Sequence, residues 1–254
     1  MNLSGVSIRG ASLSGVISQG SNLNIETSGL LVYLNVSDID SYPGSGNTWT
    51  DTQGANDATL YGPTYSVSDG GTFIFDGLND YIQINDSADM RAEVGTVRTI
   101  QTWVKIKSYV DSDGIWGKQY GNIGGYDGYS LAIRTNNILR LQMNGGTVNG
   151  GYNSSNNVFS TSTWMFLTAI VRFGGGAGSP SLLYKDDNSS PLISVSNTET
   201  VIPNNDAPFI FGRDVQEGSD YADIDIGALF VYNKALNTTE IANNFNATKT
   251  RFGL

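Results

Sequence analysis

The sequence predicts an all-β protein: two antiparallel sheets packed face to face as a jelly-roll sandwich, with an extended N-terminal arm and a short C-terminal helix. Two observations support this prediction. Apolar residues occur in about a dozen short runs of strand-forming residues, and many of the 31 glycines lie between these runs as turn residues. Only one segment carries the start signal of a helix. We therefore expect residues 1–28 to form the arm and residues 29–254 to form a single sandwich domain.

The arm contains a near repeat with a ten-residue period, formed by residues 3–12 and 13–22. Each copy offers only isolated Leu, Val and Ile among Ser and Gly, and two copies are too few for a solenoid. Such a segment buries too little apolar surface to become ordered alone. We therefore expect it to become ordered on a partner surface, for example by adding a strand to a neighbouring subunit. A flexible N-terminal tail is the alternative.

The central unit of the predicted fold is residues 72–84. Strand-forming runs at both of its ends flank a turn at Gly77, so the segment predicts a β-turn-β unit. The carboxylates of Asp76 and Asp80 lie beside the bend. There they either accept hydrogen bonds from backbone N–H groups or hold a hard cation.

The other strands are predicted, in chain order, from apolar runs bounded by turn residues: 29–35, 97–107, 114–118, 129–134, 138–143, 164–173, 181–185, 208–213 and 224–232. Residues 48–51 and 58–63 are predicted as short strands or loop crossings. The apolar parity slips around Trp103, which predicts a bulge or a strand buried on both faces. The pair Asn136-Asn137 is typical of a hairpin turn. The run 164–173 is the most apolar and predicts a central strand, with a buried helix as the competing interpretation.

The helix signal lies near the C-terminus. Asn237 is a capping residue and stands three positions before Glu240, which is the spacing of a capping box. This pair predicts a short helix over residues 241–247.

Charge and missing residue types exclude several kinds of function. The net charge is −10 and no run of Lys or Arg forms a basic patch, so we expect no nucleic-acid partner. The chain has no Cys and no His, which excludes disulfides, thiolate nucleophiles and the commonest zinc ligands. No apolar run approaches the roughly 18 residues of a membrane span, so we expect no membrane insertion.

Several motifs carry a family resemblance: Ser41-Tyr42-Pro43-Gly44-Ser45-Gly46 with Thr48-Trp49, Gly62-Pro63-Thr64-Tyr65, Phe75-Asp76-Gly77 with Asn79-Asp80-Tyr81, Thr102-Trp103-Val104, Ser162-Thr163-Trp164, and residues 227–236 with Glu240-Ile241. On these motifs the chain resembles the concanavalin A-like lectin/glucanase superfamily, in its laminin-G-like branch. The sequence of residues 41–84 is similar to the sequences of tailed-phage structural proteins that carry this domain. The resemblance implies a concanavalin A-like jelly-roll sandwich.

Enzymes of this superfamily place two Glu residues in an E-x-D-x-x-E pattern, because retaining hydrolysis requires two carboxyl groups about 5 Å apart. The Glu residues of this chain are Glu26, Glu93, Glu199, Glu217 and Glu240, and none has a second Glu within five residues. We therefore expect no hydrolase activity. A different carboxylate pair among Asp220, Asp223 and Asp225 is the alternative, although the alternation of Asp223 and Asp225 equally suits a polar strand edge.

The resemblance also implies candidate ligands. Many relatives bind calcium, and Asp76 and Asp225 match positions near the usual metal of the family, so Ca²⁺ with oxygen ligands is the expected cofactor. Tyr120, Tyr126 and Tyr129 lie in or beside a Gly-rich loop, where their rings could stack on sugar faces. These three tyrosines are the candidate glycan site.

Two hypotheses for the function follow. In the first, the chain is a non-enzymatic virion structural protein on the surface of a tailed phage, either a capsid decoration or a fibre module. Its arm binds other capsid or fibre subunits, it forms a homo-oligomer, and its sandwich projects outward, where it can also adhere to host glycans. In the second, the chain is a carbohydrate-binding lectin module without catalytic activity. The start at Met1, the lack of an export signal and the arm favour the first hypothesis.

Overall fold

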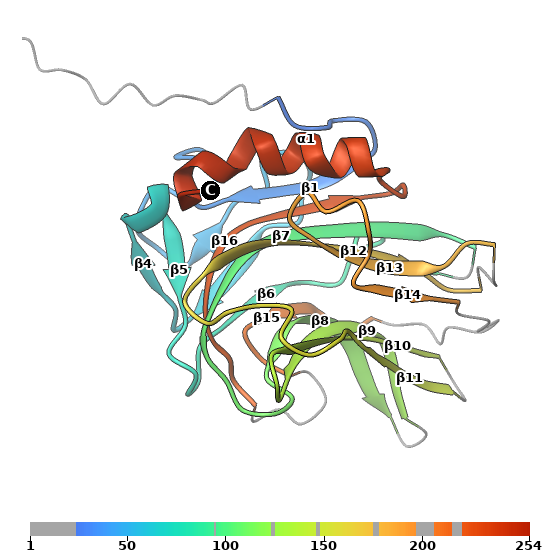
Figure 1. Ribbon diagram of the computed structural model, residues 1–254. Helices are drawn as coiled ribbons and strands as arrows, with labels where there is room; N and C mark the ends of the chain where they lie inside the picture. The colour runs from blue at the N-terminus through green and yellow to red at the C-terminus, as the bar shows by residue number, and fades with distance from the viewer. Residues whose placement is uncertain are drawn as a thin grey trace, which may run out of the picture.

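A computed structural model of the chain describes residues 24–93, 95–122, 125–145, 148–174, 178–196, 206–214 and 220–254. These residues form two antiparallel β-sheets packed face to face, with helix α1 (Thr238–Thr248) lying on the outer face of one sheet (Figure 1). The predicted sandwich with a short C-terminal helix is therefore confirmed. The repeat at 3–12 and 13–22 lies outside the described residues.

The sheet under the helix, sheet A, contains β1 (Leu30–Asn35), β4 (Thr64–Ser66), β5 (Thr72–Ile74), β7 (Val97–Ser108), β12 (Trp164–Arg172), β13 (Ser181–Lys185), β14 (Ile193–Val195) and β16 (Asp223–Tyr232). Its order is β14-β13-β12-β7-β16-β5-β4, and β1 also pairs with β16. The central position predicted for residues 164–173 is confirmed, because β12 is buried along almost its whole length. The predicted irregularity near Trp103 is confirmed as a register shift between β7 and β16.

The second sheet, sheet B, contains β2 (Thr48–Trp49), β3 (Ala58–Tyr61), β6 (Tyr81–Ile84), β8 (Gly114–Asn122), β9 (Gly125–Arg134), β10 (Ile138–Gly145), β11 (Val148–Asn153) and β15 (Phe209–Phe211). Its order is β11-β10-β9-β8-β15-β6-β3-β2. The hairpin predicted at Asn136-Asn137 joins β9 to β10, and both residues have positive φ, at 64° and 54°. Positive φ at both central positions gives a turn whose twist matches that of the flanking strands.

Residues 72–84 differ from a simple hairpin, because β5 belongs to sheet A and β6 to sheet B. The turn between them therefore crosses from one sheet to the other. Both strands direct apolar side chains into the same core, with Phe73 and Ile82 fully buried. Gly77 lies at the crossing with φ of 74°, and a Cβ there would be only 3.1 Å from the Cβ of Asp223. A residue without a side chain is needed at this point.

Sheet A is buried on both faces. Its inner face forms the main core with sheet B, and its outer face forms a second core with α1 and the 3₁₀ turn η2 (Lys249–Phe252). The predicted capping box is confirmed: the side chain of Asn237 accepts from the backbone N–H of Glu240, and the Glu240 carboxylate accepts from that of Asn237. Within the described ranges, no helix has the length and apolar content needed to cross a membrane.

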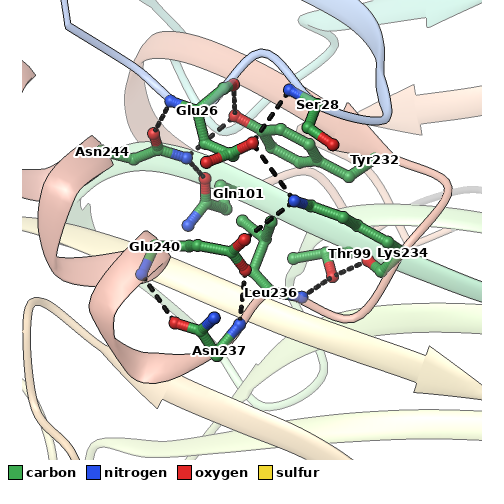
Figure 2. A network of polar contacts seen from close by, with 10 residues as sticks. All are labelled: Glu26, Ser28, Thr99, Gln101, Tyr232, Lys234, Leu236, Asn237, Glu240 and Asn244. Carbon is green, nitrogen blue, oxygen red and sulfur yellow. Dashed lines mark hydrogen bonds and ion pairs between the residues drawn. The ribbon is translucent and has the colours of Figure 1, made fainter.

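A polar network fixes residues 24–28 beside α1 (Figure 2). The Glu26 backbone N–H donates to Asn244 Oδ1 at 2.7 Å, and the Tyr232 hydroxyl donates to the Glu26 carbonyl at 2.9 Å. Lys234 Nζ lies 3.2 Å from the Glu26 carboxylate and 2.8 Å from that of Glu240. The last residues of the expected arm therefore contact the sandwich domain on the side of the helix.

Candidate functional site

The outer face of sheet B is on the side of the molecule away from α1 (Figure 1). Side-chain alternation along β10 shows which residues reach it. Leu139 and Leu141 are fully buried in the core between the sheets, so Arg140, Gln142 and Asn144 lie on the opposite face. This face is therefore polar in the middle of the sheet.

The register of sheet B extends this polar character across neighbouring strands. One row of directly paired residues consists of Gln142, Ser130, Gly117, Ile210, Gln83 and Thr59. The hydroxyl of Ser130 donates to Gln142 Oε1 at 2.9 Å, which fixes both side chains. In this row Ser130 and Gln142 are buried, whereas Gln83 and Thr59 are half-buried.

An aromatic stack lies at one end of this face. Tyr61 of β3 and Tyr81 of β6 are direct cross-strand partners, and their rings are stacked with centroids 4.5 Å apart and planes 9° from parallel. The guanidinium Cζ of Arg213, which follows β15, lies 4.7 Å from the Tyr81 centroid. Since β6 lies between β3 and β15, Tyr81 is held between its two neighbours, and Tyr61 remains 41% exposed. The stack offers a fixed, exposed aromatic surface.

Arg213 also lines a narrow recess, which has no room for a water molecule, together with Gly114, Trp116, Ser130, Leu131, Ala132 and Asp214. This recess is too small to hold a sugar. The exposed aromatic ring of Tyr61 nevertheless suits a pyranose, which has an apolar face that can lie on it.

The structure corrects one of the predicted glycan residues. Tyr129 faces the core: it is 1% exposed, packs against Trp116 and Phe209, and donates its hydroxyl to the Met90 carbonyl. Burial raises the pKa of the Tyr129 phenol. Its ring is therefore enclosed by the core and is not available to a sugar.

The other two predicted tyrosines lie at the far ends of β8 and β9. Tyr120 pairs in register with Asp127, and Tyr126 with Gly121. The positions of these two tyrosine side chains lie outside the described residues, so this part of the expectation stays a prediction.

Tyr61 and Tyr81 were missed as candidates, although the sequence holds a signal for one of them. In Tyr81-Ile82-Gln83-Ile84, the two isoleucines alternate with Tyr81 and Gln83. Strict alternation places the isoleucines in the core and Tyr81 outside. The contact between Tyr61 and Tyr81 depends on strand pairing, which the alternation alone does not reveal.

Asp225, one of the two residues expected to bind calcium, is ion-paired with lysines. Its carboxylate lies 2.8 Å from Lys105 Nζ and 3.4 Å from Lys107 Nζ. Lys107 Nζ also lies 2.7 Å from the Asp223 carboxylate and donates to the Phe75 carbonyl at 2.8 Å. These ammonium groups lie where Asp225 would hold a cation, and calcium binding stays a prediction. Among the residues that the structure describes, no cluster of three or more acidic side chains is placed to hold a metal ion.

Asp76 has a local structural role. It lies at the exposed turn after β5, and its Oδ1 accepts from the backbone N–H of Leu78 at 2.8 Å. This is the backbone-bonding alternative that the sequence left open for a carboxylate beside the bend. Asp225, in contrast, is 5% exposed on β16.

Asp223 and Asp225, two of the alternative catalytic carboxylates, also have partners in the structure. Asp223 bonds both Lys107 and the Ser108 hydroxyl, and Asp225 is ion-paired as described above. Glu26 and Glu240 both contact Lys234 in the network beside α1. The described geometry of these residues is therefore that of structural ion pairs.

Comparison with known proteins identifies the superfamily of the chain. A model of the concanavalin A-like lectin/glucanases superfamily, of laminin G type, matches residues 75–242. No curated protein matches the sequence.

Solved structures resemble the fold. Trypanosoma rangeli sialidase in complex with sialic acid has a TM-score of 0.65 at 15% identity, covering 89% of this chain and 34% of the sialidase. Botulinum neurotoxin type C, which depends on interaction with two ganglioside molecules to enter cells, has a TM-score of 0.65 at 16% identity, covering 87% of this chain and 51% of the toxin chain.

The binding domain of Paraclostridial Mosquitocidal Protein 1 also has a TM-score of 0.65, at 18% identity, covering 87% of this chain and 52% of that domain. The chain thus spans between 34% and 52% of the length of these proteins. At such low identities the likeness shows the fold alone.

Proposed function

Since this chain belongs to the concanavalin A-like lectin/glucanase superfamily, we propose that it is a carbohydrate-binding module that holds its glycan on the outer face of sheet B. The observation that carries this proposal is the exposed stack of Tyr61, Tyr81 and Arg213. In the proposed complex the apolar face of a sugar ring lies on Tyr61.

The position of the stack supports this role over a purely structural one. A tyrosine that only fills the core is enclosed, as Tyr129 is, whereas Tyr61 is 41% exposed and contributes nothing to the main core. On the outer face of sheet A, in contrast, α1 and η2 pack over a cluster of buried apolar side chains. The ganglioside dependence of the neurotoxin supports the same ligand class for this fold, although that property belongs to the toxin.

The proposed module has no hydrolase activity. The paired Glu residues of the family enzymes are missing from the sequence, and the carboxylates of Asp223 and Asp225 are engaged by Lys107 and Lys105.

Substitution of Tyr61 tests the proposed site. A glycan array identifies a bound glycan, and isothermal titration calorimetry then measures its Kd. We expect Tyr61→Ala to weaken binding about tenfold, which corresponds to about 1.4 kcal/mol, because the sugar loses its stacking surface. Stability should change little, since Tyr61 lies outside the core.

Val67→Ala is the control for this experiment, because Val67 is 79% exposed and follows β4 in sheet A. It removes exposed apolar surface far from the proposed site and should leave the Kd unchanged. If Tyr61→Ala bound the glycan with the wild-type Kd, the aromatic stack would not be part of the binding site.

We further propose that the module is a structural protein of a tailed phage, located on the virion surface as a homo-oligomer and attached through its N-terminal arm. The sequence of residues 41–84 supports the phage assignment by its resemblance. The network around Glu26 supports the attachment, because it holds residues 24–28 beside α1 (Figure 2). Helix α1 lies on the side of the molecule away from the outer face of sheet B (Figure 1). A chain anchored there presents the proposed glycan face outward.

Deletion of residues 1–23 tests this attachment. The deletion keeps Glu26 and its contacts with Asn244 and Tyr232, so we expect a domain that melts cooperatively at nearly the full-length temperature. Mass spectrometry of purified particles should detect the full-length chain and find the truncated chain strongly depleted. Normal incorporation of the truncated chain, or absence of the full-length chain from the particles, would contradict the proposal.

A further inference from the structure

We propose that the glycan carries a carboxylate, as uronic and sialic acids do, and that Arg140 binds it; this inference rests on the proposed carbohydrate-binding function. Arg140 lies in the middle of β10 on the outer face of sheet B, between Ala132 of β9 and Asn153 of β11. Its guanidinium occupies the space over Gly151, where a Cβ would overlap it. The absence of a side chain at Gly151 thus creates the place in which this cation lies.

The other Lys and Arg side chains of the described ranges each have a partner. Carboxylates contact Arg91, Lys105, Lys107, Lys118, Arg134, Lys185 and Lys234. Backbone carbonyls accept from Arg98, Arg172 and Arg251. Aromatic rings lie under Arg213 and Lys249. Within the described part of the chain, Arg140 has none of these three kinds of partner, and its Nε is buried without a hydrogen bond.

The environment of Arg140 disfavours its positive charge. Burial lowers the pKa of the Arg140 guanidinium, and the nearby charge of Arg134 lowers it further. Asp111 and Asp214 oppose this effect, but Asp111 is itself 2.8 Å from Arg134. A partly buried guanidinium without a carboxylate in direct contact costs free energy in the free protein, and an anionic ligand would offset that cost.

A second unused donor lies on the same strand face. Asn144 is 3% exposed, its Oδ1 accepts from the Gly150 backbone N–H at 2.9 Å, and its Nδ2 is buried without a hydrogen bond. Arg140 and Asn144 are four residues apart on the same face of β10, and the two buried groups without a partner on this face are both donors. Only an acceptor could pair with them.

A carboxylate satisfies these requirements better than a neutral sugar does. It accepts two parallel hydrogen bonds from a guanidinium and neutralises its charge, whereas a hydroxyl group supplies only a dipole. The overall charge of −10 repels anions from most of the surface, so binding of an acidic glycan here requires a local cation such as Arg140. In the described part of the chain, Arg140 supplies such a cation on the outer face of sheet B.

Paired glycans that differ only in the carboxylate test the inference. The probes are oligogalacturonate against its methyl ester and sialyllactose against lactose, with neutral and sulfated glycans on the same array. We expect the full-length protein to bind at least one carboxylated probe about 10- to 100-fold more tightly than its neutral partner, as charge-assisted hydrogen bonds provide. Arg140→Gln should remove this preference.

Arg134→Gln is the matched control. It removes the same charge from the neighbouring strand, but Arg134 already has Asp111 as its partner, so the preference should persist. Gly151→Ala is a second variant, which displaces the Arg140 guanidinium while keeping its charge, and it should reduce the preference. Melting temperatures show whether each variant is folded, and Arg140→Gln should melt at or above the wild-type temperature because it removes a charge without a partner.

The outcomes separate the inference from the proposed function. Equal binding of neutral and carboxylated partners, lost in Tyr61→Ala, would overturn the role of Arg140 and leave the carbohydrate-binding function intact. Preference for sulfated glycans would overturn the carboxylate assignment. A folded protein that binds no glycan would overturn both.

Discussion

Asp86→Asn is expected to lower the free energy of unfolding at pH 7 by about 2–3 kcal/mol, which corresponds to a carboxyl pKa held about two units below its unfolded value. Lys118 has a side chain that is 1% exposed, and its Nζ lies 2.5 Å from Asp86 Oδ1. Arg91 contacts the same carboxylate. Asparagine keeps the shape of the side chain but removes the charge that compensates both cations.

The loss should depend on pH. Hydrogen bonding to Arg91, and then to Lys118, lowers the pKa of the Asp86 carboxyl to about 2. Since the unfolded value is about 4, the stabilisation is complete above pH 4 and disappears as the pH falls through 2. The wild-type and Asp86→Asn proteins should therefore differ strongly at pH 7 and converge near pH 2. Urea unfolding followed by tryptophan fluorescence measures this difference.

The exposed Asp187 supplies the control for this experiment. Asp187→Asn makes the same chemical change without a buried cation nearby, and it should shift the unfolding free energy by no more than about 0.5 kcal/mol. A difference between wild type and Asp86→Asn that stayed constant from pH 7 to pH 2 would show that the carboxylate charge is not its cause.

Trp103→Ala should lower the free energy of unfolding by about 3–5 kcal/mol and destabilise the C-terminal helix. Trp103 is fully buried between sheet A and the helix, with its ring 4.2 Å from that of Phe252 and 5.0 Å from that of Phe166. Its Nε1 donates to the Thr248 hydroxyl at 2.8 Å, which joins β7 directly to the last turn of α1. Denaturant unfolding measures the loss, and amide hydrogen exchange should show faster exchange in residues 238–252.

Trp103→Phe separates packing from hydrogen bonding in this contact. It keeps an aromatic ring in the core but cannot donate to Thr248, so we expect a loss smaller than that of the alanine variant. If hydrogen exchange in the helix were unchanged in Trp103→Ala, the helix would have to be held mainly by other contacts.

Much of the fold could be predicted because its signals are local. The capping box at Asn237, the hairpin turn at Asn136-Asn137 and the apolar run 164–173 each depend on residues close together in the chain. The path of residues 72–84 was harder to predict from the sequence, because alternation shows which side chains enter the core but not which sheet a strand joins. Phe73 and Ile82 fill the same core from opposite sheets.

The site was less predictable than the fold because it depends on pairing between distant segments. In the sequence Asp225 resembles a metal ligand. In the structure its cross-strand neighbour on β7, Lys105, forms an ion pair with it. Tyr129 resembled a ligand-binding aromatic because its loop is Gly-rich, but the strand register turns its ring inward. In both cases the residue type indicated a plausible chemistry, and the neighbouring strand decided its role.

The pairing of β1 with β16 has a consequence for how the chain folds. Leu30 pairs with Tyr232, so the first and last strands of sheet A are hydrogen-bonded although almost the whole sequence separates them. The strands β8 to β11, in contrast, pair with their sequence neighbours. On a ribosome the local strands can pair early, whereas the edge pairing of β1 must wait until the C-terminal strand has emerged. Such high contact order places the domain among slow-folding β-proteins, with β1 left unpaired during synthesis.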